Sequence, residues 1–273
     1  MSTELEAFDE AVAGITAPGQ PFEVNTVELG GHTYRNFANM QRNLGEYFQV
    51  MHAHADKDFA VYLDERYTFR QAYQHSAEFG AALAQRYGIA KGDRVAILSR
   101  NNPQWLMSFI GAISVGAVAV PMNAWWTTEE LDYGFGDCGA KVVVADRQRI
   151  ERLLPIAEKH GLQIISVDDC EGLDVQHTPF NNLLAEFNGA SMPAVDVDLE
   201  DHATIMYTSG STGHPKGALS SHRGVLAALW SWMCMGVATK MAGTQEQRDA
   251  DLPPVALLTI PLFHCTASHS AFM

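Results

Sequence analysis

The sequence predicts an α/β fold in which parallel sheets are covered by helices on both faces. Short apolar runs recur along the chain, and they have the length of buried strands. Stretches with helix-start signals separate these runs, so that strands and helices alternate. The chain has 273 residues, of which 47% are hydrophobic, and this is enough to bury such a core.

The regular alternation begins near Tyr67. Thr68 is placed to cap a helix, and Gly88 suits the end of that helix because glycine adopts the left-handed conformation easily. A strand is predicted at 95–98. Asn102 then caps the next helix, and Pro103 occupies its first position, where the missing N–H costs nothing.

The alternation continues through the middle of the chain. A strand at 117–120 follows the Pro103 helix, and Thr127 with Glu130 forms a capping box for the helix after it. The other elements expected here are strands at 141–144 and 164–167, with a helix at 148–160 that Pro155 disturbs. Strands that are apolar throughout indicate a parallel sheet that is buried on both faces.

The two ends of the chain are less regular. Residues 1–40 mix glycine, proline and polar residues, and we expect an irregular arm with at most a short helix. Residues 168–200 are expected to loop over the surface. A helix is predicted from about Val225, and a final buried strand at 255–260.

Composition narrows the class of protein. The net charge is −14, from 32 Asp and Glu against 18 Lys and Arg, so the surface repels nucleic acids and anionic lipids. The acidic N-terminus does not have the pattern of a signal peptide, and the four separated cysteines have no metal-ligand spacing. We therefore expect a cytoplasmic protein, in whose reducing compartment the thiols stay free. The longest apolar runs, 108–122 and 225–238, fall short of the roughly 20 residues of a spanning helix, so no membrane span is expected.

The segment 207–217 reads Tyr-Thr-Ser-Gly-Ser-Thr-Gly-His-Pro-Lys-Gly and carries the chemistry. Its glycines allow several backbone N–H groups to turn towards one anion, and the four serine and threonine hydroxyls add donors. Lys216 adds a positive charge at the far end. Such a loop after a buried strand is suited to grip a polyphosphate.

The residues of this loop allow two other interpretations. A Walker-type loop needs a hydroxyl residue after its lysine, but Gly217 stands there and Pro215 precedes the lysine, so the sequence excludes it. A Ser/Gly-rich surface turn without a ligand is common, but rarely so dense in donors. Lys216 taken alone could also be a solvated loop lysine.

Residues 208–217 resemble the signature loop of the AMP-forming adenylating enzymes: acyl-CoA synthetases, luciferases and peptide-synthetase adenylation domains. Further segments resemble the N-terminal pattern of this family in the same order, namely 67–69, 91–97, 101–105, 116–121, 137–141 and 261–264. The resemblance covers roughly residues 40–273. It implies the partial N-terminal domain of an acyl-adenylate-forming enzyme.

The resemblance implies a ligase that activates a carboxylic acid with ATP as acyl-AMP and passes it to coenzyme A. ATP, Mg²⁺ and coenzyme A are therefore the expected cofactor and co-substrates, and fatty acid metabolism is the expected setting. By similarity, the phosphate contacts are Thr208, Ser209, Gly210, Ser211, Thr212, Gly213 and Lys216. Thr208 is also a candidate Mg²⁺ contact.

Other residues keep two interpretations. By resemblance His264 forms a wall of the acyl pocket, but a hydrogen-bonded core histidine fits its position equally. Trp125 and Trp126 are expected to be packing residues. The apolar run 225–238 is expected to be a core helix, and it could also line an acyl tunnel.

Members of this family are longer than this sequence. Beyond this point they carry adenine and ribose contacts, a magnesium-binding glutamate and a C-terminal lid with the catalytic lysine. We therefore expect residues 41–273 to be a truncated AMP-binding domain that catalyses no ATP–pyrophosphate exchange. The apolar surface left uncovered favours self-association. The sequence leaves open whether the acid is fatty or aromatic. A carrier-protein thiol or an oxygen is an alternative acceptor to coenzyme A. A short form that binds nucleotide without catalysis is a further alternative.

Overall fold

The computed structural model describes residues 2–208, 214–244 and 255–272. The chain divides into two compact units, which are described separately. The arm unit comprises Met1–Gln41, Arg223–Leu257 and His269–Met273, and the sheet unit comprises Arg42–His222 and Leu258–Ser268. The candidate site lies in the sheet unit.

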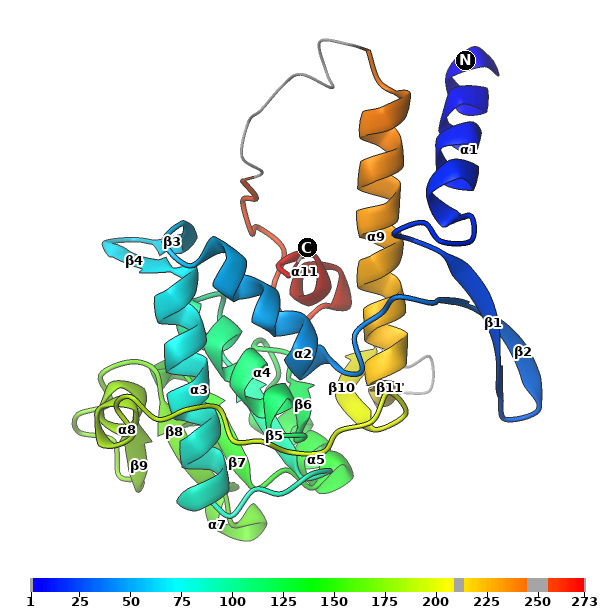
Figure 1. The fold of residues 1–273 in the computed structure, drawn as a ribbon. Coiled ribbons are helices and arrows are strands. Elements are labelled where there is room, and N and C mark those ends of the chain that lie inside the picture. The colour runs from blue at the N-terminus through cyan, green and yellow to red at the C-terminus, as the bar shows by residue number, and fades with distance from the viewer. Residues whose placement is uncertain (1, 209–213, 245–254, 273) are drawn as a thin grey trace. The chain divides into compact units, whose positions relative to one another are not determined.

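The sheet unit is built on a seven-stranded sheet (Figure 1). Its strands lie in the order β11 (Lys216–Ser221), β10 (His202–Thr208), β6 (Val118–Pro121), β5 (Arg94–Leu98), β7 (Val142–Ala145), β8 (Gln163–Ser166) and β9 (His177–Pro179). Neighbouring strands are parallel except β10 and β11, which form an antiparallel hairpin. The predicted α/β fold with a parallel sheet is therefore confirmed.

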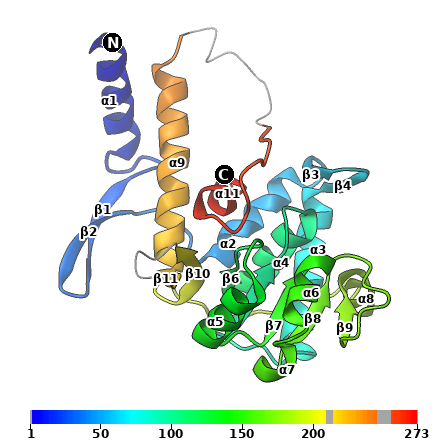
Figure 2. The same ribbon diagram turned by 180° about the vertical axis from the view of Figure 1, so that it is seen from behind.

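Helices cover both faces of this sheet (Figures 1 and 2). On one face lie α3 (Phe69–Gln85) and α4 (Pro103–Ser114), and on the other lie α5 (Thr128–Cys138), α6 (Arg147–Leu153) and α7 (Ala157–His160). Strands β5, β6 and β7 are almost wholly buried between these layers, which is why their sequences are apolar throughout. Smaller elements complete the unit: α2 (Leu44–Phe48), η1 (Gln49–His54), β3 (Asp58–Tyr62), β4 (Glu65–Thr68) and α8 (Phe180–Glu186).

Three helix starts are those that the sequence predicts, whereas α8 and β9 form within residues 168–200, where a surface loop was expected. Thr68 caps α3 and Thr127 caps α5, each in a complete capping box, and Asn102 caps α4 with Pro103 in the first turn. The helix predicted at 148–160 is divided into α6 and α7 around Pro155. These local signals hold because each satisfies backbone N–H groups that a helix leaves unpaired.

Helices α3 and α4 approach each other closely through glycines. A Cβ atom at Gly111 of α4 would lie 2.6 Å from the carbonyl oxygen of Ser76 and 2.9 Å from the ring of Phe79, both on α3. Gly80 of α3 meets the backbone of Gly111 in the same way, at 3.3 Å from its carbonyl oxygen. The contact therefore depends on the absence of side chains at both positions.

The arm unit differs from the irregular arm that the sequence predicts. Residues 2–16 form α1 (Ser2–Thr16), and β1 (Val24–Leu29) pairs with β2 (His32–Phe37) in a hairpin. Four apolar side chains of α1 pack with Cys234 and Ala238 of α9 (His222–Ala242). These four are Phe8, Ala11, Val12 and Ile15. The spacing of these apolar residues is that of one helix face and indicates a helix. The expectation of an irregular arm rested instead on the glycine and proline residues that follow in the sequence.

Two expectations for the last third of the chain are corrected. No strand forms among the described residues 255–260, and Val255 and Leu257 are 89% and 88% exposed. The predicted helix is longer than the run 225–238. Helix α9 has 21 residues, and an 18-residue window within it has a mean hydropathy of 1.3, which suffices for a membrane span by length and composition alone. A helix that packs against protein meets the same test. Self-association through these apolar residues stays a prediction.

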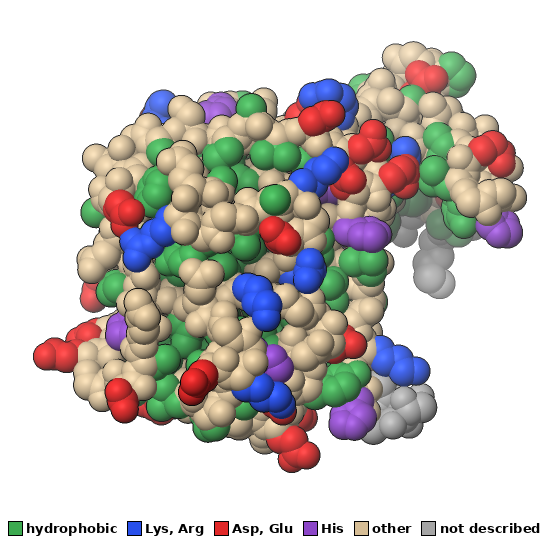
Figure 3. Space-filling view, turned by 90° about the horizontal axis from the view of Figure 1, so that it is seen from below, with side chains coloured by type: hydrophobic (Ala, Val, Ile, Leu, Met, Phe, Trp, Pro, Cys, Tyr) green, Lys and Arg blue, Asp and Glu red, His purple; other side chains and the backbone are tan. Residues whose placement is uncertain are grey.

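Charged side chains of both signs are dispersed on the surface. On the face seen in Figure 3, Lys and Arg side chains alternate with Asp and Glu side chains among uncharged atoms. The exposed ion pairs bear out this mixing, for example Arg70 with Asp56 and Lys159 with Asp132. This arrangement agrees with an acidic, well-solvated protein.

A buried histidine joins two distant parts of the sheet unit. His222 follows β11 directly and is fully buried, and its Nδ1 accepts a hydrogen bond of 3.1 Å from the backbone N of Leu44, at the start of α2. Burial lowers the pKa of His222 to about 4, although the nearby Asp201 carboxylate pulls it upward. The imidazole is therefore neutral in the folded protein at neutral pH.

This histidine predicts a loss of stability in mild acid. Between pH 6.5 and 4 the unfolded chain binds a proton at His222 that the folded chain does not, so stability falls as the pH falls. The loss should reach about 3 kcal/mol near pH 4. Urea unfolding across this range should show a flatter pH profile for His222→Asn, which keeps an acceptor for Leu44. The exposed His202→Asn should leave the profile unchanged, and equal slopes for all three proteins would contradict the prediction.

Candidate functional site

The segment with the predicted phosphate loop is carried by the β10–β11 hairpin. Thr208 ends β10 and Lys216 begins β11, and the two residues are cross-strand partners. The hydroxyl of Thr208 donates to the backbone carbonyl oxygen of Lys216 at 3.4 Å, and both residues are exposed. The chain therefore returns as a strand after the loop instead of entering a helix, as the exclusion of a Walker loop requires. The candidate residues Ser209, Gly210, Ser211, Thr212 and Gly213 lie outside the described residues.

The hairpin places Thr208 at the carboxyl edge of the parallel sheet. β10 is parallel to β6, so its last residue leaves the sheet on the same edge as the segments that follow β5, β6 and β7. β5 lies between β6 and β7. The chain runs from β5 to β6 on one side of it, and the connection from β6 then passes back across β5 to β7 on the other side. Ligands of open α/β sheets bind at such a switch point, outside the carboxyl ends of the strands.

Helix α5 contacts both limbs of the hairpin. The Tyr207 hydroxyl, one residue before the loop, donates to the Asp137 carboxylate at 2.6 Å. On the other limb, the ring of His214 stacks on Tyr133 with ring centroids 4.6 Å apart. Burial, followed by the hydrogen bond to Asp137, raises the pKa of the Tyr207 phenol, so it stays protonated and acts as a donor.

His264 is not a buried core residue. It is exposed, because the strand expected before it does not form and a turn stands there instead. Its backbone N donates to the carbonyl oxygen of Pro261 at 3.0 Å, and its own carbonyl oxygen accepts from Ala267 and Ser268 in α11 (Cys265–Ser270). The hypothesis of a hydrogen-bonded core histidine is therefore wrong, and a place in the acyl pocket stays a prediction.

One asparagine holds the segment that leads to His264. The side chain of Asn101, which follows β5, donates to the carbonyl oxygens of Leu258 at 3.1 Å and Ile260 at 2.9 Å. Its Oδ1 accepts from the backbone N of Leu262 at 2.8 Å. All three hydrogen bonds go to backbone groups, so Asn101 fixes the course of this segment at the carboxyl edge of β5 whatever its side chains are.

A hollow of about 270 Å³ lies beside the carboxyl ends of β5 and β6. Its lining comes from residues after β5 and β6, from the last residue of β3 and from the segment that Asn101 holds. The lining residues are Tyr62, Ser99, Arg100, Asn101, Ala124, Trp125, Thr259, Pro261 and Phe263. Trp125 is 59% exposed and meets Phe263 edge-to-face at 5.2 Å. Trp125 therefore packs on Phe263 but is more exposed than the prediction of a packing residue implies, and its ring borders an open hollow, whereas Trp126 is buried as expected.

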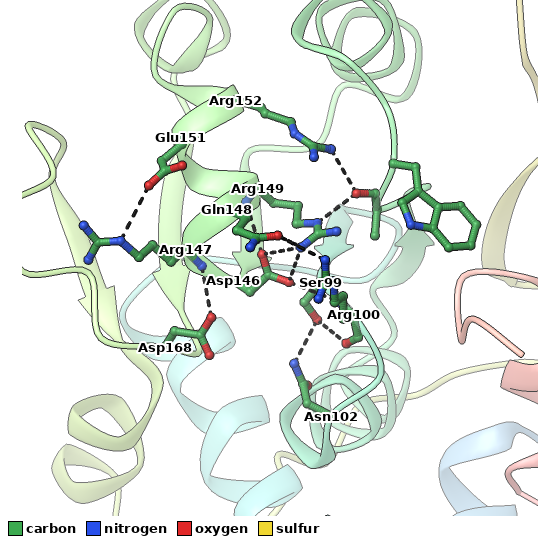
Figure 4. A network of polar contacts seen from close by, with 12 residues as sticks. Ser99, Arg100, Asn102, Asp146, Arg147, Gln148, Arg149, Glu151, Arg152 and Asp168 are labelled. Atoms are coloured by element: carbon green, nitrogen blue, oxygen red, sulfur yellow. Dashed lines mark hydrogen bonds and ion pairs between the residues drawn. The ribbon is translucent and has the colours of Figure 1, made fainter. Parts of the chain in front are cut away.

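An arginine network ties together the segments after β5, β6 and β7 (Figure 4). The buried Asp146 pairs with the buried Arg149 at 3.2 Å and accepts from the backbone N of Arg100 at 3.0 Å. Arg149 Nε donates to the carbonyl oxygen of Ala124 at 2.8 Å, and Arg152 donates to the same oxygen at 3.1 Å. The network thus gives the edge of the sheet a fixed shape.

This network was missed at the sequence level. The local signal was present, because Asp146 directly follows an apolar strand and caps α6 at Arg149, three residues on. Its contacts to Arg100 and Ala124 lie more than twenty residues away in sequence, however, and a single sequence gives no means to pair them.

The magnesium ion that the resemblance implies would need few protein ligands if phosphate oxygens held it. The described residues contain no group of three or more His, Cys, Asp or Glu side chains placed to bind a metal. Thr208 offers one hydroxyl at the predicted phosphate site. Mg²⁺ commonly keeps several waters and binds through phosphate oxygens with one or two protein ligands, so a single protein hydroxyl suits it.

The chain matches a protein family and several characterised proteins. Residues 47–273 match the family described as AMP-binding enzyme. The chain is 30% identical over 230 residues to 4-hydroxybutyrate–CoA ligase 2 of Metallosphaera sedula, which covers 82% of this chain and 38% of that protein. It is 36% identical over 183 residues to the long-chain-fatty-acid–CoA ligase FadD13 of Mycobacterium tuberculosis, covering 66% and 32%.

Solved structures agree with the sequence matches. The N-terminal domain of FACL13 from Mycobacterium tuberculosis superposes with a TM-score of 0.63 at 27% identity, over 85% of this chain and 54% of that one. The anthranilate CoA ligase AuaEII in complex with anthranoyl-AMP gives 0.63 at 25% identity, over 70% and 36%. The chain spans about a third of the length of the curated relatives it matches.

Proposed function

This chain belongs to the AMP-binding enzyme family, and on that premise we propose that it serves the ATP-dependent activation of a carboxylic acid and its transfer to coenzyme A. In the first step a carboxylate oxygen attacks the α-phosphorus of ATP, and pyrophosphate leaves. In the second the thiol sulfur attacks the acyl carbon, and AMP leaves. Both steps bring anions or electron-rich groups together, so the protein must supply positive charge and fixed geometry.

The observation that carries this proposal is the position of the β10–β11 hairpin. It holds Thr208 and Lys216 side by side at the carboxyl edge of the sheet. The strands β5, β6 and β7 also end at this edge. The ammonium group of Lys216 would neutralise the terminal phosphates, and the hydroxyl of Thr208 would meet a phosphate oxygen or Mg²⁺. The candidate residues 209–213 would complete the phosphate contacts.

The acid and the acceptor are proposed from the relatives and from the hollow. The relatives named above are CoA ligases, which supports coenzyme A over a carrier-protein thiol as the acceptor. Their acids differ, since the names specify 4-hydroxybutyrate, a long-chain fatty acid and anthranilate. The rings of Tyr62, Trp125 and Phe263 around the hollow favour an apolar acyl or aryl group there, with His264 close by in sequence. We therefore propose a fatty or aromatic acid.

The test is MgATP binding by the chain, measured by isothermal titration calorimetry. Replacing Lys216 by alanine should weaken binding by about 10- to 100-fold, since a charge-assisted hydrogen bond contributes about 1.5–3 kcal/mol. Lys216→Arg should recover part of the affinity because it keeps the charge.

A matched control is Lys240→Ala, which removes an exposed lysine from α9 and should leave MgATP affinity unchanged. Equal affinity of the Lys216→Ala variant and the unaltered chain would remove the proposed role of the hairpin. An unaltered chain that binds no MgATP at millimolar concentration would count against nucleotide binding by this unit.

A further inference from the structure

The face of α5 that meets the hairpin is formed by Tyr133, Gly134 and Asp137, and we call these residues the α5 platform. Tyr133 and Asp137 are four residues apart, so they lie on the same side of the helix. Asp137 engages Tyr207 on the strand before the loop, and Tyr133 engages His214 on the return limb. One helix face thus contacts both limbs of the hairpin, close to where the loop begins and where it ends.

The fit between platform and hairpin is tight on the strand side. Tyr207 and Gly217 are cross-strand partners in the hairpin. A Cβ atom at Gly217 would lie 2.8 Å from the side chain of Ile205, 3.5 Å from the Tyr207 ring and 3.6 Å from the Asp137 carboxylate. The absence of a side chain at Gly217 therefore lets the strand pack closely beside the Tyr207–Asp137 hydrogen bond.

The platform is itself shaped by a second glycine. A Cβ atom at Gly134 would lie 2.7 Å from the ring of Trp126, so the bare backbone at this position allows that ring to lie against α5. Trp126 in turn meets Tyr207 edge-to-face at 5.2 Å. The carbonyl oxygen of Gly134 also lies 3.3 Å from the Tyr207 hydroxyl. The Tyr207 side chain is thus fixed by contacts on several sides.

From these contacts we propose that Tyr133 and Asp137 are positioning residues for phosphate binding, which act through His214 and Tyr207. They fix the two limbs of the hairpin and thereby the places of Thr208 and Lys216, the two described residues of the proposed phosphate site. Neither Tyr133 nor Asp137 need touch the nucleotide. This inference rests on the proposed function, because it assigns to α5 the alignment of that same site.

The stacked pair gives the sharper test. In calorimetry with MgATP, Tyr133→Ala and His214→Ala should each weaken binding about 3- to 10-fold, the range expected from the coupling of an aromatic pair. The double variant should be no weaker than either single variant, because both remove the same contact. Tyr133→Phe keeps the stacked ring and should bind as the unaltered chain does. Multiplying effects in the double variant, or unchanged affinity in both single variants, would overturn the proposal.

A second measurement does not depend on nucleotide. Amide hydrogen exchange at Thr208, Lys216 and Gly217 should be faster in Tyr133→Ala than in the unaltered chain and restored in Tyr133→Phe. Unchanged exchange in Tyr133→Ala would refute the platform even if the chain bound no MgATP. Conversely, faster exchange with no MgATP binding by any variant would leave the positioning contact standing and defeat the proposed function alone.

Discussion

Replacing Asp146 by alanine should destabilise the sheet unit by about 3–5 kcal/mol, the usual cost of leaving one partner of a buried ion pair alone. The guanidinium of Arg149 is almost fully buried and would lose its carboxylate partner. The same change removes the cap of α6 and the acceptor for the backbone N of Arg100. Urea unfolding followed by circular dichroism would measure the loss.

Two further variants separate charge from capping. Asp146→Asn keeps an acceptor for the α6 cap but leaves Arg149 without a counter-charge, so most of the loss should persist. Combining Asp146→Asn with Arg149→Met should recover stability, because an apolar replacement of both charges is often neutral. A loss below about 1 kcal/mol for Asp146→Ala, or no recovery in the double variant, would contradict this account of the network.

Replacing Gly111 by alanine is the second change with a large expected effect. Alanine should favour an isolated helix by about 1 kcal/mol over glycine, so propensity alone predicts stabilisation. The added Cβ would instead meet the Ser76 carbonyl oxygen at 2.6 Å, and this atom belongs to the backbone and cannot rotate away. Helices α3 and α4 would have to separate, at a net cost of about 1–3 kcal/mol.

Gly136 of α5 provides the matched control for this variant. It is also a helical glycine of the sheet unit, but a Cβ there would meet nothing closer than an atom of His160 at 3.8 Å. Gly136→Ala should therefore stabilise the protein by up to about 1 kcal/mol, as propensity predicts. Thermal unfolding of both variants would decide the matter, and opposite signs are expected. Stabilisation by both would show that the helix contact is loose.

The buried part of the fold could be predicted because its sequence signals are local. The strands β5, β6 and β7 are apolar at nearly every position, and the helices between them begin with caps that can be recognised from three or four residues. Both signals reflect a free-energy cost that arises within the segment itself, namely exposure of apolar surface or of unpaired N–H groups.

The errors have the opposite origin. β11 was missed because its exposed sequence, from Lys216 to Ser221, has no apolar alternation and forms through pairing with β10. The strand expected at 255–260 was wrong because an apolar run shows a tendency to be buried and does not supply a neighbouring strand. His264 failed as a core residue for the same reason, since its predicted burial depended on that strand.

For the candidate site, the sequence identified the loop but not its surroundings. Thr208 and Lys216 became candidates through the density of donors around them and the resemblance of their loop to the family's signature loop, and both are properties of consecutive residues. Asn101, Asp146 and Tyr133 were not found, because each acts on a segment distant in sequence. Supporting residues of this kind become visible only when the topology brings the segments to one edge.

The hairpin has a consequence for how the charge of a nucleotide would be balanced. A loop that opens a helix adds the partial positive charge of the helix N-terminus to its backbone donors. Here a strand follows the loop, so the attraction rests more heavily on the exposed ammonium of Lys216. Dissolved ions screen such an exposed charge over about 8 Å at physiological ionic strength. Nucleotide affinity should therefore decline more steeply with added salt than it does at a helix-borne loop.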